Sequence, residues 1–206
     1  MDVQIFDCEQ GTDEWKAARL GIPTASEFAT VMAKGKAGGD SKTRRTYMLK
    51  LIGERLTGEP MWSYNNEHME RGKMMEDEAR DLYAMLKDCE PQRVGFIRRG
   101  EAGASPDSLV ESNGLLEIKT KLPHLHIDAI LAGQLPPEHK AQCQGQLWIS
   151  GREWLDFVSY WPGLAPFVVR VERDEPYISS IRSAIDDFLG ELAETMSKVE
   201  RYRAAA

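Results

Sequence analysis

Two carboxylates and a lysine lie close together in the middle of the sequence, as Asp107, Glu117 and Lys119. The segment around Glu117 is typical of a strand, so side-chain alternation puts Glu117 and Lys119 on one face and turns Ile118 into the core. An Asn-Gly turn signal precedes this segment, and a hairpin there can bring Asp107 beside Glu117. Converging carboxylates repel each other unless a cation such as Mg²⁺ or Mn²⁺ neutralises them. These residues indicate metal-assisted hydrolysis, with Lys119 orienting or helping to deprotonate a water and stabilising charge on a reacting phosphate.

The same three residues also fit a plain alternative, a solvated strand with an ion pair between its charged side chains. Other candidate sites are weaker. Three histidines, His124, His126 and His139, lack a matching metal-binding motif and are interpreted as residues of the surface or of the edge of a substrate site. The glycine-rich segment 34–42 lacks the Lys-Ser/Thr pair of a phosphate-binding P-loop. Trp15 is interpreted as a core aromatic residue.

Composition limits the class of protein. The chain has 206 residues, 26 Lys and Arg against 33 Asp and Glu, and a formal charge of −7. This length and an ordinary apolar content predict one folded domain over residues 1–206. The acidic balance disfavours a protein that coats nucleic acid by bulk charge, although basic residues gather between Lys34 and Arg45. Three scattered cysteines exclude a disulfide framework and, with an acidic N-terminus, favour the cytoplasm.

Helices and strands alternate in the pattern of an α/β or α+β fold. Helices are predicted over Asp13–Leu20, Ser26–Met32, Ser41–Arg55, Glu67–Leu86, Pro136–Ile149 and Tyr177–Tyr202. Strands are predicted over Val94–Gly100, Ser108–Ser112, Gly114–Thr120, Trp154–Trp161 and Pro166–Arg173, the first three as a meander. The two carboxylates then lie on neighbouring strands of one sheet.

Five stretches of the sequence resemble the phage lambda exonuclease family, also called YqaJ-like viral recombinases, within the PD-(D/E)XK nuclease superfamily. They are QGTDEWKAARLGIPTASEF, ERGKMMEDEARDLY, ASPDSL, GLLEIKT and AQCQGQLW, in the family's order and close to its spacing. The resemblance implies a restriction-endonuclease-like core, in which helices flank a central mixed β-sheet. Ser108 departs from the pattern, because relatives often have Gly after the aspartate.

The resemblance also implies roles for individual residues. Asp107 and Glu117 correspond to the metal-binding carboxylates, with the backbone carbonyl of Ile118 as a further ligand and Lys119 as the catalytic lysine. The other carried-over positions are Glu76, for metal-bound water or a second metal; Gln144, and less surely Gln142, at the active-site edge; Arg19 and Ser26, for the 5′-phosphate; and Lys36, in a DNA-contacting loop.

Physical chemistry agrees with the phosphate assignment. As a helix N-cap, Ser26 would place free N–H groups and a positive dipole end near a phosphate. Arg19 would add a bidentate fork for phosphate oxygens. The alternatives are that Ser26 is only a cap, Arg19 only a surface residue and Glu76 only one of several solvated helix acids.

The resemblance therefore implies a Mg²⁺-dependent exonuclease that degrades linear double-stranded DNA from a 5′-phosphorylated end in phage-type homologous recombination. It further implies a ring-shaped homotrimer, a single-strand annealing recombinase as partner and the cytoplasm of a bacterial host. Mn²⁺ would substitute for Mg²⁺. The alternatives are another PD-(D/E)XK endonuclease, a RecB-like repair nuclease and a non-catalytic DNA-binding protein. A Cas4-like enzyme is excluded, because its iron–sulfur cluster needs four cysteines and this chain has three.

Overall fold

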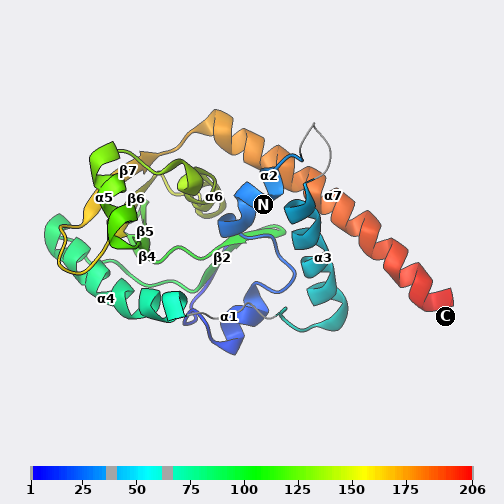
Figure 1. Ribbon diagram of the computed structural model, residues 1–206. Coiled ribbons are helices and arrows are strands. Elements are labelled where there is room, and N and C mark those ends of the chain that lie inside the picture. Colours follow the sequence, from blue (N-terminus) through cyan, green and yellow to red (C-terminus); the bar gives the residue numbers. More distant parts are fainter. Residues whose placement is uncertain (1, 36–40, 62–66, 206) are drawn as a thin grey trace.

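The structure, a computed structural model, describes residues 2–35, 41–61 and 67–205 (Figure 1). Its elements in chain order are β1 (Val3–Phe6), α1 (Asp13–Ala18), η1 (Ala25–Glu27), α2 (Phe28–Met32), α3 (Lys42–Thr57), α4 (Glu67–Lys87), β2 (Phe96–Arg99), β3 (Ala102–Ala104), β4 (Ser108–Val110), β5 (Gly114–Thr120), α5 (Pro123–Ala132), η3 (Pro137–His139), α6 (Lys140–Ser150), β6 (Trp154–Tyr160), β7 (Phe167–Glu172) and α7 (Glu175–Ala205). In this part of the chain, no helix is long and apolar enough to cross a membrane.

The strands form two sheets. An antiparallel sheet has the order β1-β2-β3, and a mixed sheet has the order β4-β5-β6-β7. Within the mixed sheet, β4 and β5 form an antiparallel hairpin, β5 and β6 are parallel, and β7 returns antiparallel to β6. The parallel pair requires a long crossover, which α5, η3 and α6 supply.

Helices cover both faces of the mixed sheet, and strand alternation sorts the residues of β5 between them. Leu116 and Ile118 pack with Tyr83 of α4, whereas Leu115 packs with Leu147 of α6. All five side chains are at most 6% exposed. Because side chains alternate along a strand, Glu117 shares the α6 face with Leu115. The expectation that Ile118 enters the core is confirmed.

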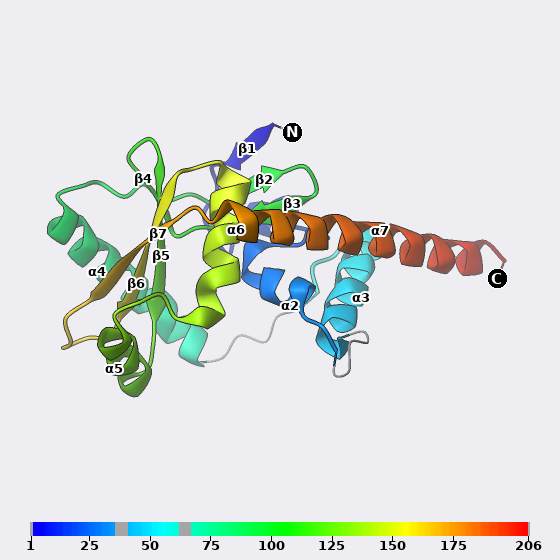
Figure 2. The same cartoon turned by 90° about the horizontal axis from the view of Figure 1, so that it is seen from above.

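Helix α6 joins the two sheets. It contacts β6 of the mixed sheet, β2 and β3 of the antiparallel sheet, and η1, α2 and α7. Figure 2 shows α6 between the mixed sheet on one side and α2 and α3 on the other. Phe28, Ile97 and Phe188 lie in the core of that second side and are at most 1% exposed. The contacts of α6 bring the N-terminal segment to the edge of the mixed sheet.

The N-terminal segment is fixed by α3. Gly21 follows α1 with a φ of +65°, a conformation that glycine adopts without strain. The buried Glu54 carboxylate accepts a hydrogen bond from the Gly21 N–H at 2.9 Å, and Arg55 Nε donates to the Gly21 carbonyl at 2.8 Å. These contacts set the position of Arg19, two residues before the turn.

Several sequence-based predictions need correction. The predicted meander is correct only for its second pair, because β4 and β5 form a hairpin, whereas β2 pairs with β1 and β3 rather than with β4. Strands β1 and β3 and helix α5 were not predicted. Ser26 is not a helix N-cap: it lies inside η1, the N-cap is Thr24, and α2 begins at Phe28. His126 is not a surface residue, because it is fully buried between Ser159 Oγ and the Ala165 carbonyl.

Candidate active site

The β4–β5 hairpin brings the two candidate metal-binding carboxylates together. Ser108 pairs with Leu116, which places Asp107 at the open end of the hairpin. The Asp107 N–H donates to the Leu116 carbonyl at 3.1 Å, and Asp107 Oδ2 accepts from the Ile118 N–H at 2.5 Å. Both contacts hold the Asp107 carboxyl beside the Glu117 side chain, as the turn signal and the spacing predict.

Three side chains donate hydrogen bonds to the buried Glu117 carboxylate, which is 1% exposed. Lys119 Nζ lies 2.5 Å from Oε1. Gln142 Nε2 donates to Oε1 at 2.5 Å, and Gln146 Nε2 donates to Oε2 at 2.6 Å. Glu117 is therefore held in one orientation by its own strand and by α6.

Burial and neighbouring charges shift the pKa values of this cluster. Burial, the Glu117 charge and the Glu76 charge raise the pKa of Asp107 well above its usual value. Burial disfavours the Lys119 ammonium, but Glu117 and Asp107 outweigh it and raise the pKa of Lys119. Lys119 is therefore protonated in this state. The two carboxylates repel each other when both are ionised, and a cation between them would relieve that repulsion.

The glutamine prediction needs correction. The Gln144 amide turns away from the carboxylates: Nε2 donates to the Glu172 carbonyl at 2.8 Å, and Oε1 accepts from the Asp174 N–H at 2.9 Å. Gln142, the less favoured candidate, lines the pocket with Gln146, which sequence reasoning missed. Helical spacing could have found Gln146, because residues four apart share a helix face and residues two apart do not.

Arg19 lines the same pocket and is stacked on Trp15. Its guanidinium carbon lies 4.1 Å from the ring centroid. The indole N–H of Trp15 reaches Ser105 Oγ at 2.9 Å and the Gly95 carbonyl at 3.1 Å. Trp15 is therefore not simply a core aromatic residue. It connects Arg19 with the Ser-Pro-Asp segment that carries Asp107.

Ser26 also reaches the pocket, although not as a helix cap. Its hydroxyl lies 3.2 Å from Thr24 Oγ1, and the Thr24 N–H donates to the Tyr47 hydroxyl at 3.2 Å. The Pro23 carbonyl accepts from the Gly103 N–H at 3.0 Å, which attaches this segment to β3. Ser26 thus offers its hydroxyl, and not a helix dipole, to a ligand.

Glu76, on α4, lies near Asp107 and is held by the buried Arg80. Arg80 donates to Glu76 Oε1 at 2.5 Å, to Asp77 Oδ1 at 2.7 Å and to Ser108 Oγ at 3.0 Å. Ser108 is fully buried, and its hydroxyl donates to the Asp107 carbonyl at 2.6 Å. Ser108 therefore connects the Glu76–Arg80 pair to Asp107, a role that a glycine at this position could not fill.

These side chains meet in one cavity of about 200 Å³. Its lining residues are Gln10, Trp15, Arg19, Thr24, Ser26, Ser105, Asp107, Glu117, Lys119, Gln142 and Gln146. Of the predicted residues, Arg19, Ser26, Asp107, Glu117, Lys119 and Gln142 line it together. Lys36 lies outside the described residues. Arg44, counted among the basic residues of that region, forms a double ion pair with Glu191 of α7.

The donor set fits a hard divalent cation. Within residues 2–35, 41–61 and 67–205, no group of three or more His, Cys, Asp or Glu side chains is arranged as a complete metal site. Asp107 and Glu117 instead offer two converging carboxylates, and their mutual repulsion is the feature that a cation would relieve. Mg²⁺ commonly binds through one or two carboxylates and keeps several waters, so two suffice.

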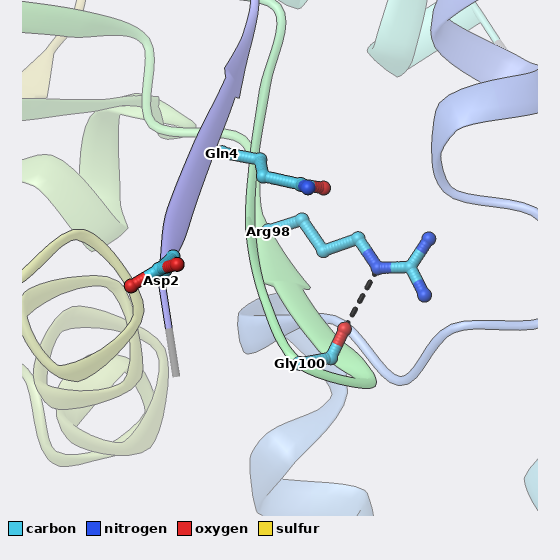
Figure 3. Close-up of a pocket in the computed structure, with 4 residues that line it drawn as sticks. All are labelled: Asp2, Gln4, Arg98 and Gly100. Carbon is cyan, nitrogen blue, oxygen red and sulfur yellow. Dashed lines mark hydrogen bonds between the residues drawn. The ribbon is translucent and has the colours of Figure 1, made fainter.

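A second depression, which shares no lining residue with this pocket, lies on the antiparallel sheet (Figure 3). It has a volume of about 510 Å³ and is lined by Asp2, Gln4, Arg98 and Gly100. Gln4 and Arg98 are cross-strand partners that extend to the same side, and Arg98 Nε donates to the Gly100 carbonyl at 2.7 Å. Its lining has one carboxylate and no group of catalytic side chains, so the pocket around Glu117 is the candidate active site.

Residues 14–153 match the model of the YqaJ-like viral recombinase domain, which is more than half of the chain. The chain belongs to this family. The family predicted from the motif stretches is therefore confirmed. Among curated proteins, no sequence match was found.

Solved structures agree with the YqaJ-like assignment. The alkaline exonuclease LHK-Exo from Laribacter hongkongensis is 39% identical, with a TM-score of 0.86 over 94% of this chain and 99% of that chain. The complex of LHK-Exo with dAMP gives the same values. A phage-related exonuclease from Haemophilus somnus 129PT, 15% identical, shares the fold with a TM-score of 0.66 over 86% of this chain and 96% of that one. The predicted mixed α/β fold class is confirmed.

Proposed function

We propose that this chain is a divalent-metal-dependent exonuclease that degrades one strand of linear double-stranded DNA from a 5′-phosphorylated end, 5′ to 3′, in phage-type recombination. The YqaJ-like family and the likeness to an alkaline exonuclease support the exonuclease activity. One observation carries the rest: Arg19 and Ser26 line the same pocket as Asp107, Glu117 and Lys119. A phosphate-gripping group and a hydrolytic group in one small cavity suit a terminal phosphate beside a scissile bond.

Asp107 and Glu117 would hold the cation, Mg²⁺ or Mn²⁺ in its place. The Ile118 carbonyl would serve as a further ligand, and Glu76 would act through water or a second cation. When bound, the cation supplies a Lewis acid that polarises the phosphate and lowers the pKa of a water. Lys119 would orient or help to deprotonate that water and would stabilise negative charge on the phosphate. Gln142 keeps the Glu117 carboxylate oriented.

Arg19 and Ser26 would set polarity by accepting a terminal 5′-phosphate. A guanidinium binds two phosphate oxygens through a planar fork, and stacking on Trp15 holds that plane in position. Since Ser26 offers a hydroxyl 3.2 Å from Thr24 Oγ1, it completes a small polar end to the pocket.

We also propose the assembly and setting that the family resemblance implies. The chain would form a homotrimer around DNA, work with a single-strand annealing recombinase and act in the cytoplasm of a bacterial host. Sedimentation of the purified chain with and without duplex DNA tests the assembly. A mass of three chains is the expected result, and a monomer at micromolar concentration in both samples contradicts it.

Digestion of labelled duplexes tests the activity. The substrates are linear DNA with 5′-phosphate or 5′-hydroxyl ends and a covalently closed circle, each with and without Mg²⁺. We expect Mg²⁺-dependent loss of the linear 5′-phosphorylated strand and an intact circle. Cleavage of the circle favours the endonuclease alternative. If the wild type shows no Mg²⁺-dependent digestion, Lys119→Ala has no activity to abolish. That result favours the non-catalytic alternative.

A further inference from the structure

The Gln146 side chain leaves one polar atom without a partner inside the candidate active site. Gln146 is 1% exposed, and its Nε2 donates to Glu117 Oε2 at 2.6 Å. Its carbonyl oxygen Oε1 is buried and accepts no hydrogen bond from the described residues. A buried polar atom without a partner costs about 1–3 kcal/mol, so a natural site retains one for a reason.

Turning the amide over does not solve this problem. Both Glu117 oxygens already take donors, Oε1 from Lys119 and Gln142 and Oε2 from Gln146, so the NH₂ group of Gln146 has to face Oε2. The carbonyl oxygen must then point the other way. Gln146 lines the pocket, so a ligand that enters the pocket is a source of the missing donor.

The chemistry of the expected ligands narrows the choice of donor. A phosphodiester or an ionised terminal phosphate offers only acceptor oxygens, so the DNA backbone cannot satisfy an amide carbonyl. Water in the shell of a divalent cation offers strongly polarised O–H donors, and Mg²⁺ usually keeps several waters in protein sites. Gln146 lies within hydrogen-bond distance of Glu117, one of the two carboxylates proposed to hold such a cation.

We propose that Gln146 is a positioning residue of the metal site: its NH₂ group orients Glu117, and its carbonyl oxygen accepts a hydrogen bond from a water of the hydrated cation. This inference rests on the proposed function in one respect, the binding of a divalent cation at Asp107 and Glu117. Gln146 fixes the orientation of that water and strengthens binding of the cation. Partners of this kind typically contribute 10–100-fold to metal affinity.

Gln142 provides a matched comparison on the same helix. Gln142 and Gln146 each give one N–H to Glu117, at 2.5 and 2.6 Å, but only the Gln146 carbonyl is a buried atom without a partner. Replacement of either by Met removes one donor from Glu117. Any additional effect of Gln146→Met therefore comes from the acceptor. Gln144→Met, with its amide bonded to backbone, controls for substitution within α6.

The experiment is a calorimetric titration of the DNA-free chain with Mn²⁺, which gives affinity without turnover. We expect Gln146→Met to raise the Kd by about 10–100-fold and Gln142→Met by at least threefold less. We expect Gln144→Met to bind as the wild type does. Equal weakening by Gln142→Met and Gln146→Met, or no weakening by the latter, overturns the proposal.

Two further variants keep the outcomes distinct. Gln146→Glu retains acceptor oxygens and loses the donor, so we expect it to bind Mn²⁺ at least as tightly as the wild type; a tenfold loss overturns the acceptor role. If Gln146→Met does not fold, this variant alone decides the question. Asp107→Asn tests the underlying function: if it binds Mn²⁺ as the wild type does, the proposed metal site itself is wrong.

Discussion

Removal of the Arg19 guanidinium tests most directly the proposal that Arg19 selects 5′-phosphorylated DNA ends. Arg19 lines the pocket stacked on Trp15, and among the described residues no carboxylate forms an ion pair or hydrogen bond with its guanidinium. Burial lowers the pKa of Arg19, with Tyr47 and the charge of Glu54 acting in the other direction. A largely buried cation without a paired anion fits a site that receives its anion with the substrate. Arg19→Ala should therefore damage recognition of the 5′-phosphate more than hydrolysis itself.

The magnitude follows from the bond that is lost. A hydrogen bond to a charged group contributes about 1.5–3 kcal/mol, and each 1.4 kcal/mol is about a tenfold change in rate or affinity. The ratio of kcat/KM for 5′-phosphorylated over 5′-hydroxyl duplexes should therefore fall by about 10- to 150-fold in Arg19→Ala. The rate on the 5′-hydroxyl duplex should change little, because that substrate has no terminal phosphate to lose.

Lys16→Ala provides the matched control. Lys16 lies in α1 close to Arg19 but pairs with the exposed Asp13 at 2.8 Å on the surface. Its removal deletes the same charge without touching the pocket, so the ratio should stay within about twofold of the wild type. The reasoning is refuted if Arg19→Ala leaves the ratio unchanged, or if it slows both substrates equally.

Three further substitutions have expected outcomes. Asp107→Asn should stabilise the metal-free chain at pH 7, because burial and Glu117 raise the pKa of Asp107 and make its ionised form unfavourable. The same variant should abolish the rise in Tm that we expect Mg²⁺ to produce, because it removes a proposed ligand. A lower stability of the metal-free variant contradicts this reasoning. Burial, followed by the charges of two lysines, lowers the pKa of His139 to about 4. The folded state therefore takes up this proton at a lower pH than the unfolded state does. As a result, the free energy of unfolding falls as the pH is lowered from about 6.5 toward 4. His139→Phe should remove up to about 3 kcal/mol of that loss in urea unfolding, and an unchanged slope refutes the assignment. Gly145→Ala should cost about 1–3 kcal/mol of unfolding free energy, because its Cβ would lie 2.4 Å from Phe28; a neutral result excludes the tight packing.

The grouping of Asp107, Glu117 and Lys119 could be predicted from the sequence because local rules control it. Strand alternation placed Glu117 and Lys119 on one face, and a turn signal predicted the hairpin that sets Asp107 beside them. The meeting of this group with Arg19 required more than local rules, because it depends on packing of α6 against η1 and β3. Only the resemblance to relatives could supply that long-range contact.

The missed elements lack a local signal. β3 consists of Ala, Gly and Ala, and its pairing depends on Phe96 packing over Gly103, where a Cβ would meet the ring at 2.0 Å. Helix α5 has no clear amphipathic pattern, because it buries the polar His126 and exposes Leu125 and Leu131. A hydropathy pattern favours neither element, and both form because the surrounding structure provides hydrogen bonds and contacts.

The choice among the glutamines failed for a different reason. Resemblance identified the stretch, but the preference for Gln144 ignored the period of the helix that carries it. Helical spacing groups Gln142 with Gln146 and turns Gln144 toward β7 and α7, where its amide bonds to backbone. A motif therefore locates a segment, and helical geometry decides which of its residues face the chemistry.

The net charge of −7 of the whole chain does not extend to the pocket. Its ionisable lining consists of two cations, Arg19 and Lys119, and two carboxylates, Asp107 and Glu117, so the formal charges cancel. Phosphate oxygens therefore meet no net attraction from these four groups alone. A divalent cation would make the same pocket doubly positive and would also release the repulsion between the carboxylates. Under the proposed function, the cation would therefore help to hold the DNA end as well as support hydrolysis, and an overall acidic protein could bind a polyanion at one local site.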